Sequence, residues 1–439
     1  MSGSDALGAR AVATRMPDGS FRLSGEKMWI TNGGFADLFI VFAKVDGEHL
    51  TAFIVERAFG GVVSGREEHK MGLDGSSTTA LVLSDVPVPA ANVLGDVGKG
   101  HKVAFNVLNV GRFKLGAMCL GGARHVIGES ARYAAHRKQF GQPIASFGAI
   151  RHKLGEMTAR TFALESLLYR TAGLVEAHGQ SAAGDGDRAL VQALEEFAVE
   201  ASIAKVLGTE VLEYVVDENV QVHGGNGFVR DYEAERHYRD ARVNRIFEGT
   251  NEINRLLIPG RLLKRAASGD LPLMGAARAL RDELMGPAVV EDAVGSDGLE
   301  AERRAVAGFR KTVLLVAGAA VERHGQALEH EQEVLLWLAD LAIDTYASDS
   351  AVQRASAALA SGQRGASAQC DAASVFVQGA ALRLEAAARQ ALGALASGDA
   401  LRVHLAALRR LLKVPPADTV SMRRRLADAT VSAGACLFG

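Results

Sequence analysis

Residues 105–137 read FNVLNVGRFKLGAMCLGGARHVIGESARYAAHR and contain no proline. The apolar residues of this stretch recur every three or four positions, which is the period of an α-helix with a buried face. Its Ala, Leu and Arg favour the same structure, because these residues lose little conformational entropy in a helix. The stretch therefore predicts a long buried helix that begins near Gly100.

Further stretches have the same pattern and indicate a bundle. We predict a second helix from about Phe147 to Glu176, a third over residues 190–221 and a fourth that begins near Asn251. The polar sequence GQSAAGDGD at 179–187 is typical of a loop. Four long antiparallel helices form a bundle, which we assign to residues 99–266.

The residues before the bundle have the pattern of strands. Short apolar or β-branched runs bounded by Gly, Asp or Asn occur at 21–30, 38–45 (LFIVFAKV), 50–57 (LTAFIVER) and 77–88 (STTALVLSDVPV). Asn32-Gly33-Gly34 and Asp46-Gly47 are turn signals of the kind that join such strands. Residues 1–98 are therefore predicted to form a small antiparallel β-barrel or sandwich.

The residues after the bundle are again predicted to be helical. The sequence SGDLPLMG at 268–275 resembles a linker, and Gly295-Ser296-Asp297-Gly298 is typical of a break between helices. Helical patterns continue to about Ala433, and residues 331–363 have a pattern similar to that of 147–180, which indicates a weakly repeated unit. We assign residues 267–439 to a C-terminal helical extension, so the predicted fold class is α+β and mostly α.

Composition excludes several classes of protein. Lys and Arg total 49 and Asp and Glu total 51, so the net charge of −2 gives no basic field for nucleic acid. The three cysteines lie far apart and form no disulfide framework, which favours a reducing compartment. The N-terminus has no secretory pattern, and no apolar run approaches the ~20 residues that span a bilayer. We therefore expect a soluble protein of the cytoplasm, or of the mitochondrial matrix if the source is eukaryotic.

Three short segments carry chemistry when they are taken together. They are RKQFG at 137–141, QVHGGNG at 221–227 and RIFEGTN at 245–251. Glycines let a backbone approach a pyrophosphate closely, and an arginine offers it a bidentate charge. Glu248, between Phe and Gly in a turn before a helix, is positioned for desolvation and a raised pKa.

Other residues that suggest chemistry have simpler explanations. His223 and His237 show no metal-ligand spacing, so we expect satisfied or surface histidines and no metal site. Cys119 lies on an apolar helix and is expected to be a buried small hydrophobe. Residues 95–100 lack the spacing of a phosphate loop and are expected to form a turn that enters the first helix.

The ordered segments WITNG (29–33), NVGRF (109–113), RKQFG (137–141), QVHGGNGF (221–228) and FEGTNEI (247–253) resemble the acyl-CoA dehydrogenase family over about residues 3–265. Gly111-Arg112-Phe113, Phe147-Gly148 and the helical extension look like its very-long-chain branch. The resemblance implies an FAD enzyme that desaturates a fatty acyl-CoA between Cα and Cβ. Glu248 matches the family's catalytic base. Some members carry the base immediately before the arginine of the first bundle helix, where this chain has Gly111.

The resemblance also implies the residues that hold the cofactor and the substrate. FAD contacts are implied at Trp29, Ile30, Thr31, Arg137, Gln139, Phe140, Gln221, Gly224, Gly225, Thr250 and Asn251. Substrate-side positions are implied at Ser4, Asn109, Arg112, Phe247 and Gly249. In the family, the thioester oxygen is held by the backbone N–H of the base and a flavin hydroxyl, which acidifies the α-carbon.

The resemblance finally implies partners and leaves two alternatives. An electron-transfer flavoprotein is the implied electron acceptor, and the segment RKQFG, which reaches the FAD of a neighbouring subunit in the family, implies a homodimer. A non-catalytic scaffold of the same fold and an acyl-CoA oxidase remain the alternatives. Family members begin with a helical domain that this chain lacks ahead of Gly3-Ser4-Asp5, so we expect residues 1–439 alone to bind FAD weakly, aggregate and turn over acyl-CoA poorly.

Overall fold

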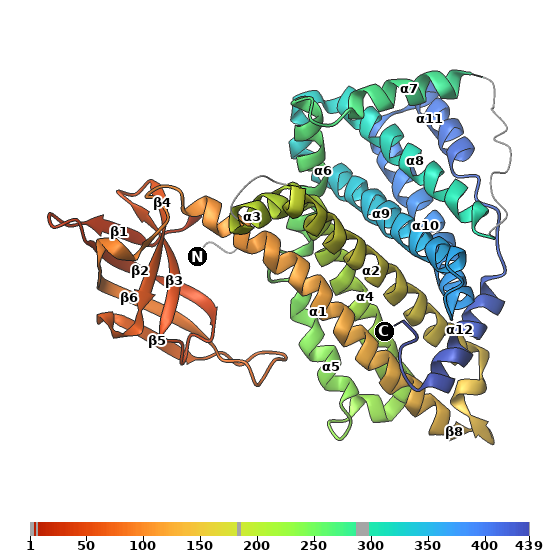
Figure 1. The fold of residues 1–439 in the computed structure, drawn as a ribbon, viewed down its shortest axis with the longest axis horizontal. Coiled ribbons are helices and arrows are strands. Elements are labelled where there is room, and N and C mark those ends of the chain that lie inside the picture. Colours follow the sequence, from red (N-terminus) through yellow and green to blue (C-terminus); the bar gives the residue numbers. More distant parts are fainter. Residues whose placement is uncertain (1–3, 6–7, 182–185, 287–297, 439) are drawn as a thin grey trace. The chain divides into compact units, whose positions relative to one another are not determined.

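The computed structural model describes residues 4–5, 8–181, 186–286 and 298–438. The chain divides into two compact units, Met1–Gly111 and Arg112–Gly439. The first unit carries the sheet and the start of α1, and the second carries the remaining helices (Figure 1). This confirms a mostly helical α+β protein with an antiparallel-rich sheet. The division into three domains stays a proposal.

The sheet of the first unit has seven strands in the order β5-β6-β2-β1-β3-β4-β7. The strands are β1 (Val12–Arg15), β2 (Phe21–Thr31), β3 (Leu38–Val45), β4 (His49–Glu56), β5 (Val62–Glu67), β6 (Thr78–Val88) and β7 (Val93–Leu94). The four predicted runs correspond to β2, β3, β4 and β6, whereas β1, β5 and β7 were not predicted. One pairing, between β1 and β3, is parallel, and the others are antiparallel.

Alternating side chains of these strands build the core of the first unit. In β3, Phe39, Val41 and Ala43 are buried while Leu38 and Ile40 are exposed, as the period of a strand requires. The β3–β4 hairpin turns at Asp46 and Gly47, whose φ angles are 54° and 77°. Left-handed values at two consecutive residues suit an Asp-Gly turn, which confirms this turn signal.

The helices of the bundle follow the predicted order with three corrections. They are α1 (Gly100–His136), α2 (Gly148–Ser181), α3 (Gly186–Glu196), α4 (Ala198–His223), α5 (Ala234–Ala241) and α6 (Asn251–Ala267). The predicted loop at 179–187 is wrong at both ends, because α2 continues to Ser181 and α3 begins at Gly186; residues 182–185 lie outside the described part. The single third helix over 190–221 is also wrong, because the chain breaks at Phe197, and α5 was not predicted.

Glycines allow two helices of the bundle to pack closely. A methyl group at Gly208 of α4 would lie 2.9 Å from the Gly116 Cα of α1, which is too close for any side chain. Farther along, the Ser130 hydroxyl of α1 donates to Asn219 Oδ1 of α4 over 2.6 Å. Residue numbers rise together along both helices, so α1 and α4 run in the same direction and their C-terminal ends lie together.

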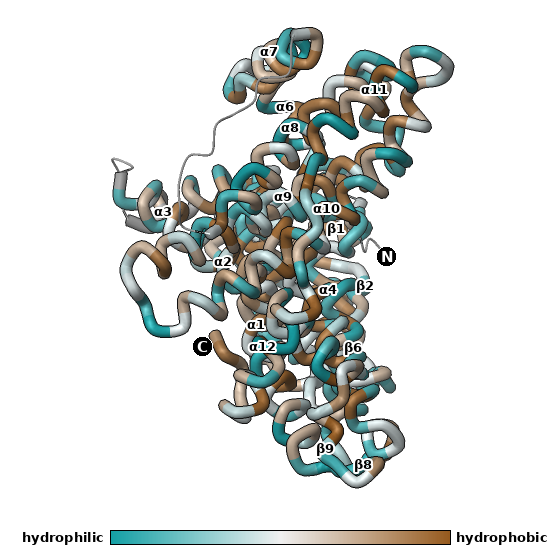
Figure 2. The backbone as a smooth tube through the Cα atoms, turned by 90° about the vertical axis from the view of Figure 1, so that its right-hand side faces the viewer, coloured by the Kyte–Doolittle hydropathy of each residue, from teal (hydrophilic) through white to brown (hydrophobic). Residues whose placement is uncertain are grey.

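Among the described residues, six helices make up the rest of the second unit. They are α7 (Leu273–Met285), α8 (Glu300–His324), α9 (Gln332–Ala360), α10 (Ala366–Leu395), α11 (Gly398–Leu411) and α12 (Thr419–Ala433). Of these, α9, α10 and α12 pack against α2 of the bundle. Brown and teal alternate along the tube of the six helices in Figure 2, as expected for helices that bury one face. The predicted linker at 268–275 is shorter than expected, because α7 begins at Leu273. Most of the predicted break at 295–298 lies outside the described residues.

Short segments complete the secondary structure. They are the two-stranded ribbon β8 (Lys138–Gln139) and β9 (Gln142–Pro143) and the 3₁₀ turns η2 (Arg57–Phe59), η3 (Ala90–Asn92), η4 (Ile144–Ser146), η5 (Gly224–Phe228), η6 (Arg242–Arg245) and η7 (Gly325–His330). Residues 95–100 form the predicted turn into α1, with φ of 77° at Gly95 and 79° at Gly98. Among the described residues, we find no helix that combines the length and apolar character needed to cross a membrane.

Candidate active site

Glu248 lies in a strained turn between η6 and α6. Its φ is 57° and that of Gly249 is 77°, so two consecutive residues adopt the left-handed conformation. For a glutamate this conformation is uncommon and persists only where surrounding contacts impose it. The turn ends at Thr250, whose hydroxyl accepts a hydrogen bond from the Ile253 N–H and so caps α6.

Two buried side chains that the sequence analysis missed hold this turn. Lys205 of α4 is fully buried, and its ammonium donates to the Gly249 carbonyl over 2.8 Å and to Asn251 Oδ1 over 2.7 Å. The Asn254 amide of α6 donates to the carbonyls of Gly249 (2.8 Å) and Thr250 (3.0 Å). The main chain after Glu248 is therefore fixed from two helices.

The environment of the Glu248 carboxylate is half-buried and positive. Burial raises its pKa, and the charges of Arg112, Lys205 and Lys114 act in the opposite direction. No residue that the structure describes donates a hydrogen bond to this carboxylate. A desolvated carboxylate without a hydrogen-bond donor keeps its lone pairs available for a proton, which agrees with the raised pKa that the sequence predicted.

Arg112 of α1 lies against the same turn. It is 5% exposed, and a methyl group at Gly249 would lie 3.7 Å from its Nη2. Burial lowers the pKa of Arg112, and the charge of Glu248 raises it. The structure thus brings together Arg112, Glu248, Gly249, Thr250 and Asn251, which the sequence analysis had selected from two distant segments.

Asn251 is occupied by contacts inside the protein. Besides accepting from Lys205, its amide donates to Thr209 Oγ1 and to Glu210 Oε1, both over 3.1 Å. Its side chain therefore supports the turn, and a contact from Asn251 to a cofactor stays a prediction. Burial lowers the pKa of Lys205 to about 8, so this lysine is a desolvated cation in the same network.

The glycine segment at the end of α4 is open. Gly224 has φ 59° and ψ −135°, a conformation for glycine alone, while a methyl group at Gly225 would meet nothing within 4 Å. The turn is held from α1, where the Tyr133 hydroxyl donates to the His223 carbonyl (3.2 Å) and accepts from the Asn226 amide (3.0 Å). The His223 ring, which is buried and stacked on Tyr133 at 4.0 Å between centroids, is satisfied as predicted.

The segment RKQFG forms a small ribbon directly after α1. Strands β8 and β9 pair through a turn at Phe140 and Gly141, whose φ angles are 51° and 82°. The Phe140 ring is 90% exposed and meets only the edge of Phe147, at 5.9 Å between centroids. Arg137 and Gln139 are exposed too, and Gln221 is exposed beside the glycine segment. The ends of α1 and α4 thus place both predicted cofactor segments on one end of the bundle.

Most of the remaining predicted site residues belong to the first unit. Trp29, Ile30 and Thr31 end β2, where Trp29 has φ 56° and is 64% exposed. Asn109 is buried in the first part of α1, and Ser4 is exposed. In the second unit, Phe247 directly precedes Glu248 and is 40% exposed.

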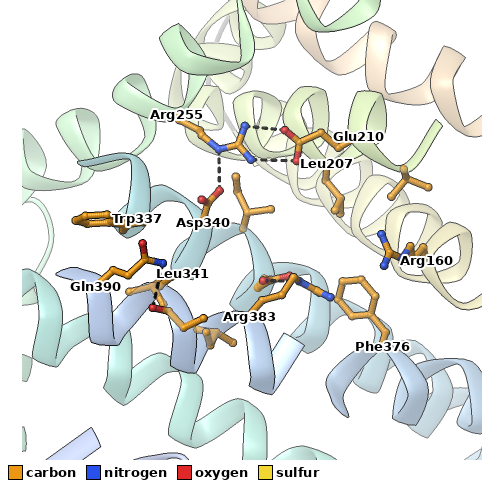
Figure 3. A pocket seen from close by; sticks show the side chains of 16 residues that line it. Arg160, Leu207, Glu210, Arg255, Trp337, Asp340, Leu341, Phe376, Arg383 and Gln390 are labelled. Atoms are coloured by element: carbon orange, nitrogen blue, oxygen red, sulfur yellow. Dashed lines mark hydrogen bonds and ion pairs between the residues drawn. The ribbon is translucent and has the colours of Figure 1, made fainter. Parts of the chain in front are cut away.

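A second polar region lies farther along α6. A cavity of about 410 Å³ opens between the bundle helices and α9 and α10, and arginine–carboxylate pairs line it (Figure 3). Arg255 donates to both Glu210 oxygens (2.7 and 3.0 Å) and to Asp340 (2.7 Å). Arg383 forms a two-pronged contact with Asp344. Because these charges are paired with one another, we interpret the cavity as a structural junction.

Comparisons with known proteins agree with this geometry. The family model of the acyl-CoA dehydrogenase middle domain matches residues 1–86, and models of the C-terminal domain match 98–263 and 308–410. A probable acyl-CoA dehydrogenase of Bacillus subtilis (strain 168) is 47% identical over 431 residues, which are 97% of this chain and 72% of that protein. The mitochondrial very long-chain specific enzyme of Bos taurus is 37% identical over 82% of this chain and 57% of its own length.

A solved structure matches the whole fold. The crystal structure of an acyl-CoA dehydrogenase complexed with FAD from Bacillus anthracis has a TM-score of 0.95 and 46% identity over 99% of this chain and 74% of that chain. The chain therefore belongs to the acyl-CoA dehydrogenase family, a family of FAD-dependent enzymes.

Proposed function

We propose that this protein oxidises fatty acyl-CoA thioesters to trans-2-enoyl-CoA, as in fatty acid β-oxidation, with FAD as cofactor and Glu248 as base. One observation carries the proposal: on a turn that two helices fix, a half-buried carboxylate has a raised pKa and no hydrogen-bond donor among the described residues. The similarity to very long-chain enzymes supports a long acyl chain as substrate.

The residues present fit FAD. A methyl group at Gly225 would meet no atom of this chain within 4 Å, so internal packing does not require a glycine there. The close approach of a cofactor pyrophosphate would require one. Arg137 and Phe140 are exposed at the same end of the bundle, with a guanidinium for phosphate and an uncovered ring. We propose that these groups hold the cofactor of a neighbouring subunit in a homodimer.

Each residue at the turn has a defined part in this reaction. Glu248 takes the α-proton of the thioester onto its carboxylate, for which its raised pKa brings the proton affinity closer to the working pH. The backbone N–H of Glu248, whose position Lys205 and Asn254 fix through the next carbonyl, donates to the thioester oxygen. The charge of Arg112 lowers the pKa of Glu248 and so favours its ionised form. FAD, when bound, supplies the acceptor for the β-hydride, and we propose an electron-transfer flavoprotein as the next acceptor.

The test is an anaerobic bleaching assay of the FAD-loaded protein. Palmitoyl-CoA should bleach the flavin absorbance of the wild type in a single turnover, which makes even a slow reaction visible. Glu248→Gln should bleach about 10²–10⁴ times more slowly, since the amide cannot accept a proton. The same samples test the expectation of weak FAD binding.

Glu252→Gln is the matched control, because it makes the same change at an exposed carboxylate in the first turn of α6. It should bleach close to the wild-type rate. Near wild-type bleaching in Glu248→Gln would contradict the assignment of the base, and no bleaching in the wild type would favour a non-catalytic scaffold. Release of peroxide in air at the rate of bleaching would identify an oxidase instead.

A further inference from the structure

Two helices of the bundle bring metal-ligating side chains together away from the Glu248 turn. His125 of α1, His237 of α5 and Glu233, the N-cap residue of α5, each place a ligand atom within 4.8 Å of the others. The two imidazole rings meet edge to face, with centroids 5.5 Å apart. Glu233 lies at the start of α5, one turn before His237, whose backbone N–H donates to the Glu233 carbonyl, so the two side chains lie on the same side of the helix. We call these three residues the histidine cluster.

The ligand atoms of His237 and Glu233 that face each other are not taken up by other hydrogen bonds among the described residues. Nε2 of His237 is buried and has no hydrogen-bond partner within the described part of the chain. Its nearest carboxylate oxygens are Oε2 of Glu129 at 3.5 Å and Oε2 of Glu233 at 3.7 Å. Arg236 pairs with the other oxygen of Glu233, Oε1, over 2.9 Å, so one oxygen of Glu233 still faces the imidazole.

Glu129 adds a second carboxylate beside the cluster. It is four residues after His125 on α1, and its Oε2 also accepts from the Asn219 amide over 3.2 Å, which fixes its position. Glu129 Oε1 faces buried His223 at 3.9 Å. Two carboxylates beside two imidazoles offer oxygen and nitrogen ligands from both helices, which favours a bound cation.

We propose that the histidine cluster binds a divalent transition metal ion, with Zn²⁺ as the probe. Two imidazoles and a carboxylate suit Zn²⁺, Ni²⁺ and Cu²⁺, whereas Mg²⁺ and Ca²⁺ prefer oxygen alone and Cu(I) prefers sulfur. Three protein ligands leave a coordination position for water. Glu129 supplies the outer charge, in the manner of carboxylates that orient metal-bound histidines.

A bound ion would connect the first helix to the segment that carries the base. Helix α5 is followed by η6 and then by the Glu248 turn, so a link between α1 and α5 fixes the start of that segment. The ion would stabilise the folded chain, because the unfolded chain does not hold these ligands together. We therefore expect Zn²⁺ to raise the melting temperature.

The experiment is a Zn²⁺ titration of the full chain after dialysis against a chelator, followed by calorimetry and thermal melting. His125→Ala removes an exposed ligand whose loss leaves the core intact, and His237→Gln removes the second imidazole. His330→Ala is the matched control, since its side chain is 78% exposed and distant in sequence from the cluster. A Co²⁺ spectrum reports whether a cysteine thiolate is a ligand.

The proposal expects one Zn²⁺ per chain, a higher melting temperature with Zn²⁺, and affinity at least about tenfold weaker in His125→Ala and His237→Gln. His330→Ala should bind like the wild type. The absence of saturable binding in the wild type would overturn the proposal. Unchanged affinity in both cluster variants, or a thiolate band with Co²⁺, would overturn it as well, because the ion would then lie elsewhere.

Discussion

Two polar regions lie one turn apart near the start of α6, and their carboxylates differ in the hydrogen bonds that they accept. At the start of the helix, Glu248 is half-buried and accepts no hydrogen bond from the described residues, while the neighbouring cations act on it through their charge. One turn farther on, Arg255 donates directly to Glu210 and Asp340 (Figure 3). A carboxylate whose oxygens already accept hydrogen bonds has a structural role. A carboxylate whose oxygens accept none can take a proton.

The cations of the two regions differ in the direction of their pKa shifts and in the groups that they bond. Burial lowers the pKa of Arg255, but the hydrogen bonds and charge of Glu210 together with the charge of Asp340 outweigh it and raise the pKa. Lys205 instead bonds the carbonyl of Gly249 and the amide oxygen of Asn251, and burial lowers its pKa to about 8. Lys205 therefore fixes the backbone of the turn without neutralising the base.

Arg255→Met is expected to have the largest effect on stability in this comparison. It removes the guanidinium that donates to both Glu210 and Asp340, and we expect a loss of about 1–3 kcal/mol, with allowance for the partial exposure of both carboxylates. Urea unfolding measures the loss. The control Arg402→Met breaks a pair with both side chains over 80% exposed and should cost at most about 1 kcal/mol. Equal losses of unfolding free energy in the two variants would contradict a special structural role for the Arg255 contacts.

Lys205→Met should lower stability by up to about 1–3 kcal/mol, because the Gly249 carbonyl and the Asn251 side-chain oxygen each lose one donor, and removal of a buried charge offsets part of this. The wild type carries a further signature. The folded pKa of about 8 lies below the ordinary 10.5, so the unfolded chain binds more protons between these values and stability rises with pH there. Unfolding at pH 8 and 10 measures this slope, which should be smaller in the variant. An unchanged slope would contradict the role of Lys205.

Thr250→Ala removes the hydroxyl that caps α6 and should cost about 1 kcal/mol. Asp418→Ala is the matched change, because Asp418 caps α12 through a bond from the Ser421 N–H. Both should lower the free energy of unfolding by similar amounts. Only Thr250→Ala should also slow flavin bleaching, since only that cap adjoins the base, and equal kinetics in the two variants would show that the cap does not support Glu248.

Arg112→Gln should change the pH dependence of bleaching. The rate rises with pH as Glu248 loses its proton, and the positive charge of Arg112 lowers the pKa of Glu248. Its removal raises that pKa, so the rising limb should move to higher pH. Lys114→Gln should move the limb in the same direction by less, because Lys114 contributes the smallest of the three opposing charges. A limb that moves to lower pH would contradict the electrostatic account.

Much of the architecture follows from local pattern. The period of residues 105–137 predicted α1, and a short apolar run bounded by turn residues predicted β3 with its observed bounds at Leu38 and Val45. Local pattern failed where tertiary contacts decide, as at the break before α4 and in the parallel pairing of β1 with β3. The helical periodicity of residues 190–221 is continuous across Phe197, so nothing in it marked the break.

The candidate site divides in the same way. The turn around Glu248 was predicted, because phenylalanine, glutamate and glycine before a helix carry a local signal. Lys205 was not, although a single lysine within the apolar run ASIAKVLG could have indicated a buried cation. Asn254 gave no signal, since an asparagine in a polar stretch is ordinary until its amide is seen to face the turn.

The sequence by itself determined the class of most segments and the family to which the chain belongs, and it selected Glu248 as the candidate base, because periodicity, turn residues and short motifs act within a few positions. Only the tertiary structure decided which distant side chains meet. Arg112 and Lys205 reach the Glu248 turn from separate helices. His125 meets His237 although more than a hundred residues separate them, so a search for metal ligands by spacing along the chain could not find the pair. Helix packing sets such distances, and no local pattern records them.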